Sequence, residues 1–232
     1  MKRKHMRLMS LLLALMVLCS AVPAASAADS AQAGAVTISV SFYDGANTQF
    51  LSGREQETLS PGFAASYGYT SAALTKHAGE VTVFDALVQA HVRLLGEVFT
   101  PETKDDFLSL SSSGMLTKVM GEGGAYGPPF GFMVNGRTPN DGVYNEVFGS
   151  YTGYTADDAV LRDGDVVELF FYQDQSYWGD TYTWFDKTEA TVQAGAPLEL
   201  TLSGYMAMFG VYTEQVIASR TEPVAEVAIV RG

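Results

Sequence analysis

Residue types that could perform catalysis are present in the sequence, but their spacing matches no known catalytic pattern. His77 and His91 are the two histidines beyond the first 27 residues, and neither belongs to a His-x-x-x-His or Glu-x-x-His pattern. The serines Ser111–Ser113 precede Gly114 with no evident neighbouring base, and the chain holds no Gly-x-Ser-x-Gly elbow. We therefore predict that the protein is not an enzyme, that it has no catalytic residues, and that both histidines lie at the surface or at an edge.

Carboxylates are the most abundant reactive groups, so a cluster of them is weak evidence for a site. Asp163 and Asp165 flank Gly164, and Asp157 and Asp158 lie just before them. Such oxygen ligands suit calcium, but the twelve-residue spacing of a calcium loop is absent. An Asp-Gly-Asp sequence before a strand is more typical of a turn, in which the carboxylates accept hydrogen bonds from nearby amides. We expect no metal site and no cofactor here.

Aromatic residues are the most informative functional feature of the sequence. The chain has 12 Tyr, 13 Phe and 2 Trp, all of which follow residue 27. Tyrosine and tryptophan in loops rich in Gly, Asn and Ser offer rigid flat area with a polar tip, which suits recognition of a ligand. On this pattern we predict the following ligand-binding residues: Tyr126, Phe130, Phe132, Asn135, Tyr144, Tyr151, Tyr154, Tyr177 and Trp178.

The N-terminal segment has the pattern of a secretory signal peptide. Four basic residues lie within Met1–Arg7, the run Leu11–Leu18 is unbroken and apolar, and Ala25–Ala27 has small residues at the two positions that a signal peptidase recognises. The apolar run is shorter than the roughly 20 residues that a membrane-spanning helix needs. Cys19 raises the alternative of a lipoprotein, which Leu18 disfavours because a small residue is required there. We expect cleavage after Ala27, with a flexible leader over residues 28–35.

Cleavage would leave an acidic, cysteine-free protein. Removal of 27 residues from 232 leaves 205, with ten basic and 26 acidic residues and a net charge of −16. Such a charge argues against partners made of nucleic acid and against docking on an anionic membrane. Without cysteine the exported chain has no disulfide and no thiol nucleophile. The hydrophobic content of 47% allows a substantial core. We expect a secreted protein with no membrane span after cleavage.

One helix and several strands are expected in the first part of the chain. Residues 82–95 have apolar side chains at helical spacing, Thr82 and Asp85 have the spacing of a capping box, and Gly96 suits the end of the helix. Strands are expected at 36–42, 107–110, 115–120, 130–134 and 166–172, the last of them apolar on both faces and so central. A strand or two with a long loop is expected over 50–75, and a loop over 138–158.

The remainder of the chain is expected to be all-β. A boundary is predicted at 180–187, followed by strand candidates at 188–192, 198–202, 211–218 and 224–230. This length is short for a β-sandwich, which needs about 100 residues. We therefore expect residues 186–232 to form part of an immunoglobulin-like module, with Gly232 ending a partial module rather than a complete one.

Three short segments carry a family resemblance. They are Val81–Leu87 at the start of the predicted helix, the strand and turn Gly131–Gly136, and the turn and strand Leu161–Leu169. In this order and spacing they resemble the transcobalamin C-terminal-like domains of secreted bacterial proteins. The resemblance covers about residues 36–174, and residues 186–232 resemble the immunoglobulin-like modules that follow such domains. It implies an α+β fold of the β-grasp type over residues 36–180, with a sheet wrapped across one helix, and a binding module without catalytic activity.

The ligand that the resemblance implies is cobalamin or a related corrinoid. In the animal cobalamin carriers this domain closes over the vitamin opposite a helical barrel, which the present sequence lacks. The sequence therefore predicts a non-catalytic extracellular binding module, associated with a cell surface, that recognises a soluble small molecule or a surface glycan or protein. Two alternatives stay open: a structural or adhesive segment of a larger surface protein, and a secreted hydrolase with a carboxylate pair such as Glu122 and Asp141.

Overall fold

The computed structural model describes residues 35–43, 50–123, 130–147, 149–172, 181–187, 190–193, 196–206, 218 and 221–229. The chain divides into two compact units, Met1–Gln32 and Ala33–Gly232, and every described residue belongs to the second. The predicted signal peptide lies outside the described residues, as does the predicted leader except for Ala35. Among the described residues, no helix has the length and apolar character needed to cross a membrane.

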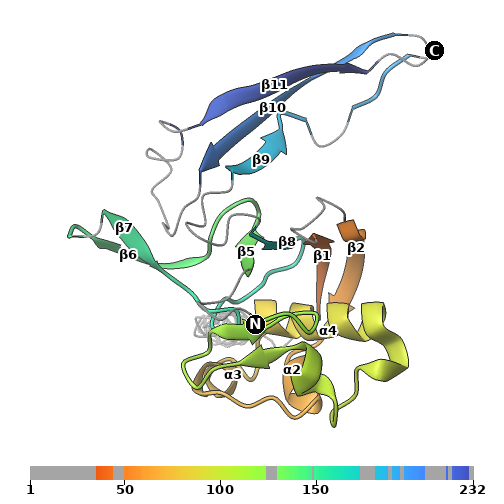
Figure 1. The fold of residues 1–232 in the computed structure, drawn as a ribbon. Helices are drawn as coiled ribbons and strands as arrows, with labels where there is room; N and C mark the ends of the chain where they lie inside the picture. The colour runs from red at the N-terminus through yellow and green to blue at the C-terminus, as the bar shows by residue number, and fades with distance from the viewer. Residues whose placement is uncertain are drawn as a thin grey trace, which may run out of the picture. The chain divides into compact units, whose positions relative to one another are not determined.

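The described residues have a mixed α+β fold organised around a four-stranded sheet (Figure 1). Its strands are β1 (Val36–Tyr43), β2 (Phe50–Leu59), β5 (Phe130–Val134) and β8 (Val166–Phe171), in the order β2-β1-β8-β5. β1 and β8 run parallel in the middle of the sheet, and β2 and β5 are antiparallel to their neighbours at the edges. The prediction of a central strand at 166–172 is confirmed, as are the strands at 36–42 and 130–134.

Helix α4 (Val83–Leu95) covers one face of this sheet and contacts β1 and β2 (Figure 1). The expected capping box is present, because the Thr82 hydroxyl accepts a hydrogen bond from the Asp85 amide and the Asp85 carboxylate accepts one from the Thr82 amide. The helix ends at Leu95, and Gly96 is the C-cap, as expected. The buried side chains that join helix and sheet include Phe84, Leu87 and Val88 from α4, Ile38 and Val40 from β1, and Val167 and Leu169 from β8.

Short helices and a small hairpin complete this core. Residues 50–75 form β2 and then two helical turns, α2 (Phe63–Ser66) and α3 (Ala72–Lys76), where a strand or two with a long loop was expected. After α4 come the 3-10 turn η1 (Gly96–Val98), α5 (Lys104–Phe107) and the hairpin of β3 (Ser109–Leu110) with β4 (Leu116–Lys118). The strand expected at 107–110 therefore begins two residues later than predicted.

Residues 138–158 contain a hairpin where a loop was expected. Strand β6 (Asn140–Asn145) pairs with β7 (Ser150–Gly153) in a separate two-stranded sheet. Side chains of β6 from Asp141 to Asn145 are all exposed. Because no face of the hairpin is buried, its sequence lacks the alternation of apolar and polar residues by which strands are recognised.

The C-terminal residues form a three-stranded antiparallel sheet in the order β11-β10-β9. Its strands are β9 (Thr181–Phe185), β10 (Leu198–Met206) and β11 (Glu222–Ile229). β9 occupies the segment predicted to be a boundary and pairs with β10, so it belongs to the C-terminal sheet. Residues 190–192 are not in a strand, and the strand expected at 211–218 lies outside the described residues except for Ala218.

Candidate functional site

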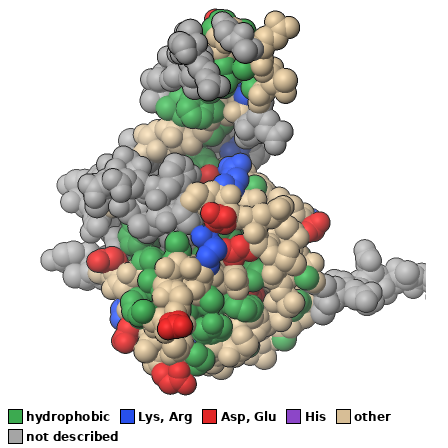
Figure 2. Space-filling view, turned by 90° about the vertical axis from the view of Figure 1, so that its right-hand side faces the viewer, with side chains coloured by type: hydrophobic (Ala, Val, Ile, Leu, Met, Phe, Trp, Pro, Cys, Tyr) green, Lys and Arg blue, Asp and Glu red, His purple; other side chains and the backbone are tan. Residues whose placement is uncertain are grey.

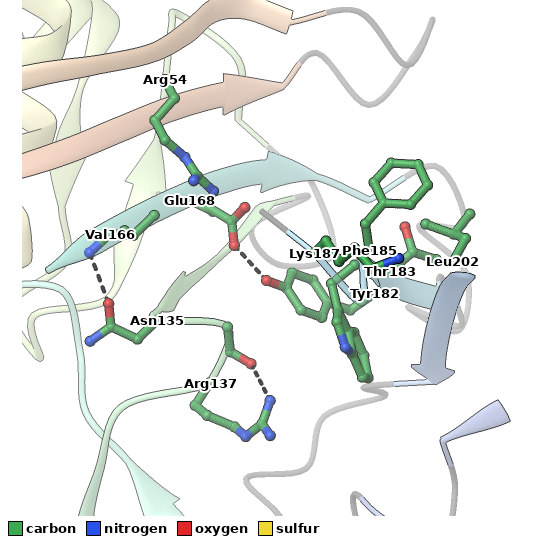
Figure 3. A pocket seen from close by; sticks show the side chains of 12 residues that line it. Arg54, Asn135, Arg137, Val166, Glu168, Tyr182, Thr183, Phe185, Lys187 and Leu202 are labelled. Atoms are coloured by element: carbon green, nitrogen blue, oxygen red, sulfur yellow. Dashed lines mark hydrogen bonds between the residues drawn. The ribbon is translucent and has the colours of Figure 1, made fainter. Parts of the chain in front are cut away.

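A pocket of about 610 Å³ lies against the face of the four-stranded sheet that points away from α4 (Figure 3). Alternation along β8 defines this face, since Val167 and Leu169 belong to the core whereas Val166 and Glu168 line the pocket. Strands β2, β9 and β10 and the turn after β5 also contribute to the lining. The residues that matter most below are Arg54, Asn135, Arg137, Glu168, Tyr182, Trp184 and Lys187.

Glu168 and Tyr182 form the polar centre of the pocket. The Tyr182 hydroxyl donates a hydrogen bond of 2.5 Å to Oε2 of Glu168 (Figure 3). The backbone of Gly136 packs closely against this tyrosine. A Cβ on Gly136 would lie 3.3 Å from the Tyr182 hydroxyl oxygen. Gly136 also has a φ of 72°, which favours glycine. A residue with a side chain at 136 would therefore disturb both the turn and the tyrosine.

Basic side chains predominate among the charged groups of the lining. Among the described residues, Arg54, Arg137 and Lys187 line the pocket with a single acid, Glu168, although acidic residues outnumber basic ones 26 to 14 in the whole chain. In Figure 3 the Arg54 side chain extends toward Glu168. The Arg137 guanidinium donates to the Gly136 carbonyl at 2.9 Å. Lys187 donates to the Glu199 carbonyl at 2.8 Å and lies 3.7 Å from the Asp186 carboxylate.

Outside the pocket, several basic side chains of the described residues lie beside acidic ones. On the face shown in Figure 2, basic side chains lie beside acidic ones. Ion pairs of this kind include Lys76 with Asp158 at 2.9 Å and Lys104 with Asp105 at 2.7 Å. Among the described residues that line the pocket, three are basic and one is acidic, and Lys187 also lies beside Asp186.

Asn135, one of the predicted ligand-binding residues, lines the pocket and also fixes the turn that carries Arg137. Its side-chain amide donates to Asp165 at 2.8 Å, and its side-chain oxygen accepts from the Val166 amide at 2.9 Å (Figure 3). Its φ of 53° lies in the left-handed region, which Asn tolerates better than most residues. Asn135 thus positions the pocket wall through the backbone of β8.

Two aromatic rings of β9 supply the flat part of the lining. Tyr182 and Trp184 lie on the same side of the strand, with ring centroids 5.9 Å apart and planes inclined by 30°. Both side chains are half-buried. Together they present an apolar surface next to the charged groups of β8 and the β5 turn.

Three of the aromatic residues predicted to bind ligand pack with the hydrophobic core instead of lining the pocket. Phe130 is 5% exposed, and its ring meets Phe171 edge-on at 5.8 Å. Phe132 and Tyr154 are partly buried against the same core. These contacts give each of the three side chains a role in stability.

The hairpin holds two further predicted residues, and three others lie outside the described residues. Tyr144 is 44% exposed and meets Tyr151 edge-on, with ring centroids 5.4 Å apart. The pair lies on the β6–β7 hairpin and does not line the pocket. Tyr126, Tyr177 and Trp178 lie in the segments that the structure does not describe.

The histidines and aspartates considered for catalysis or metal binding have structural partners. His91 is fully buried in α4, not at the surface as expected. His77 lies between the Glu80 and Asp158 carboxylates at 2.6 and 2.8 Å, and the hydrogen bond from Lys76 holds the pKa of Asp158 below its usual value.

The Asp163–Asp165 segment is the turn that was predicted. Asp163 accepts from the Thr37 amide and Asp165 from the Arg162 amide. Within the part of the chain that the structure describes, no group of three His, Cys, Asp or Glu side chains is placed to hold a metal ion.

The sequence analysis missed most of the pocket, although two signals pointed to it. Glu168 is the one charged residue in an otherwise apolar strand, Val166–Phe171. The alternation Thr181–Phe185 places Tyr182 and Trp184 at strand spacing, and this segment was interpreted as a boundary. Arg54 and Arg137 carry no such signal, because isolated arginines are ordinary surface residues.

Comparisons with known proteins identified no relative of this chain. No protein-family model matches the chain, and searches of curated proteins and of solved structures found no match.

Proposed function

We propose that this chain is a non-catalytic binding module of an exported protein, and that its ligand occupies the pocket between β8 and β9. The observation that carries the proposal is the convergence of Arg54, Arg137, Glu168 and Trp184 on one cavity from four separate strands and turns. Its volume of about 610 Å³ falls in the range of small-ligand sites, roughly 300–1,000 Å³. Aromatic surface with a few convergent charged groups is also the usual composition of such sites.

The topology supports a β-grasp interpretation of residues 36–180. The four-stranded sheet β2-β1-β8-β5 with α4 packed across one face is consistent with the sheet wrapped across one helix that the transcobalamin C-terminal-like resemblance implies. All three segments that carry the resemblance lie in this body. A corrinoid is therefore one ligand to test, alongside other small molecules and surface glycans.

The N-terminal sequence pattern supports export. A basic start, an apolar run and Ala25–Ala27 are together typical of a secretory signal. The absence of cysteine after residue 27 means that the exported chain depends on its core for stability. We place the protein outside the cell, associated with a surface.

A second candidate function, adhesion to another protein, rests on the β6–β7 hairpin. Val143 and Val147 are 64% and 88% exposed, and Tyr144 lies beside them. Exposed apolar side chains on a hairpin favour a protein contact. Variants distinguish adhesion from ligand binding. Val143→Ser and Val147→Ser would weaken only adhesion, whereas pocket variants would weaken only ligand binding.

The test is a ligand titration of the purified protein that follows tryptophan fluorescence. Cobalamin, acidic oligosaccharides and neutral oligosaccharides are each titrated to about 1 mM, where binding is worth only about 4 kcal/mol. Arg54→Gln and Trp184→Leu probe the pocket, and Arg162→Gln is the matched control because Arg162 is exposed in a turn outside it. Saturable binding that the pocket variants weaken and the control leaves unchanged supports the proposal. Failure of every ligand to bind, or binding indifferent to both pocket variants, would overturn it.

A further inference from the structure

We propose that the outer edge of β2 binds an extended segment of another protein as an additional antiparallel strand. The segment carries basic side chains at every second position, with neutral polar side chains between them. This inference goes beyond the proposed function, because Arg54 is the only residue of β2 that lines the pocket. Three properties of β2 carry it: its exposure, the direction of its backbone groups, and the charge on its α4 side.

Strand β2 is an open edge of the four-stranded sheet. Among the described strands, β1 is its only hydrogen-bonded neighbour (Figure 1). Residues 53–56 and Thr58 are all exposed, and a Cβ added at Gly53 would meet no atom within 4 Å beyond its neighbours in the chain. The opposite edge strand, β5, differs, because Phe130 and Met133 are buried and its other residues are half-buried. The β2 edge is therefore the accessible one.

The register between β1 and β2 shows which backbone groups of the edge face outward. The Ser39 amide donates to the carbonyl just before β8, so the preceding residue, Ile38, directs its N–H and C=O toward β2. Ile38 lies opposite Glu57, and Glu57 therefore directs its backbone groups toward β1. Because this direction alternates along a strand, the N–H and C=O of Gln56 and Thr58 point away from β1. An added strand would pair with these groups.

The α4 side of this edge carries an uncompensated negative charge. Glu55 and Glu57 lie opposite Val40 and Ile38, whose side chains are in the core, so both carboxylates point to the α4 side. Oε1 of Glu57 accepts from Nε of Arg93 at 2.7 Å. Glu55 is exposed and has no ion pair with a described residue. A basic side chain on the added strand would lie opposite Glu55 and compensate its charge.

The same charges disfavour pairing with a second copy of this chain. When a two-fold axis relates two antiparallel strands, residues equally far from the axis lie opposite each other. An axis at Glu55 or at Glu57 places that carboxylate opposite its own copy, and an axis at Gln56 places Glu55 opposite Glu57. Like charges directly opposite destabilise a strand pair, and edge strands use charge in this way against self-association. The occupant is therefore a different segment of opposite charge.

The probe is a peptide of alternating threonine and lysine, about seven residues long, the length of a typical strand. Its lysines lie on one side of the strand, and its threonines lie on the other, which faces the neutral side chains of Gln56 and Thr58. One comparison peptide has glutamate in place of lysine. A second keeps the composition but places the lysines next to one another. In an NMR titration the alternating basic peptide should bind at least about tenfold tighter than either, and Glu55→Lys should reverse the preference toward the glutamate peptide.

Backbone readouts identify the edge itself. The bound peptide should slow hydrogen exchange of the Gln56 and Thr58 amides and leave the Glu57 amide unchanged, because that amide already faces β1. Gln56→Pro removes an outward N–H without removing a bond to β1, and should abolish binding. The matched control, Gln56→Ala, keeps the N–H and should bind as the wild type does. Urea unfolding shows whether each variant retains its fold, and Glu55→Lys decides the question if Gln56→Pro does not.

Several outcomes would overturn strand addition at β2. They are absence of binding, equal binding of the three peptides, and equal binding by Gln56→Pro and Gln56→Ala. Protection of the Gln56 and Thr58 amides that rises with protein concentration in the absence of peptide would also overturn it, because it assigns the edge to a second copy. None of these outcomes bears on the pocket, since Gln56 does not line it.

Discussion

His91 is predicted to make the folded protein sensitive to mild acid, and the structure gives the physical reason. The ring is fully buried in α4 beside Phe99, with ring centroids 5.4 Å apart. Nδ1 lies 2.7 Å from the Leu87 carbonyl, which can only accept, so Nδ1 carries the hydrogen. Nε2 accepts the Met120 amide at 3.0 Å. These two contacts fix one neutral tautomer, because a proton on Nε2 would point at another N–H.

The magnitude follows from the difference in proton affinity between the folded and unfolded chain. Burial lowers the pKa of His91 from 6.5 to about 4, against a smaller opposing effect of the Leu87 carbonyl. Between these values the unfolded chain binds the proton and the folded chain does not, so stability falls as the pH falls. At about 1.4 kcal/mol per pH unit, the full loss is about 3 kcal/mol. This is a large part of the roughly 5–15 kcal/mol that typically stabilises a domain.

The assay measures the free energy of unfolding in urea at several pH values from 7.5 to 4.5. The comparison is with His91→Gln, which lacks the titrating ring, so that His77 and the carboxylates contribute equally to both curves and cancel. We expect the variant to be less stable at pH 7.5 and the difference to shrink as the pH falls, since only the wild type loses this contribution. Two parallel curves across this range would refute a buried neutral His91.

Three further changes test the fold around the core and the pocket. Thr82→Ala removes the cap of α4 and should lower the free energy of unfolding in urea by about 1–2 kcal/mol. Gly114→Ala should cost more than Gly142→Ala, because both have positive φ but only at 114 would a Cβ lie 2.5 Å from the Asp157 carboxylate; equal midpoints in urea would contradict this. Asn135→Ala should lower stability by about 1–2 kcal/mol through loss of its side-chain hydrogen bonds with Asp165 and Val166, and a fluorescence titration should also show weaker ligand binding.

The elements predicted best are those whose sequence signal is local. The capping pair Thr82 and Asp85 and the apolar stripe between Val83 and Leu95 are sufficient to define α4, and the structure confirms them. The central strand 166–172 was recognisable because it is apolar on both faces. In both cases the residues that form the pattern lie close together in the sequence, so the sequence pattern alone predicts the element.

Where tertiary contacts decide, the sequence was misleading. Strand β6 has no buried face and so showed no alternation. Strand β9 was interpreted as a boundary, although it pairs with β10. His91 was expected at the surface, yet its burial depends on Met120, which lies 29 residues away in sequence. No local pattern shows that a distant amide will satisfy a buried ring nitrogen.

The pocket is lined by residues other than the aromatic ones that the sequence predicted to bind a ligand. Phe130 and Phe132 were selected for their aromatic rings, but a large apolar ring near a strand is used first to fill the core. Glu168 is the opposite case, since a charge in the middle of an apolar strand is costly unless a partner meets it. That cost predicts a polar contact from elsewhere in the chain, and Tyr182 provides it from β9. A charged residue in an otherwise apolar strand is therefore the sequence signal that indicates this pocket.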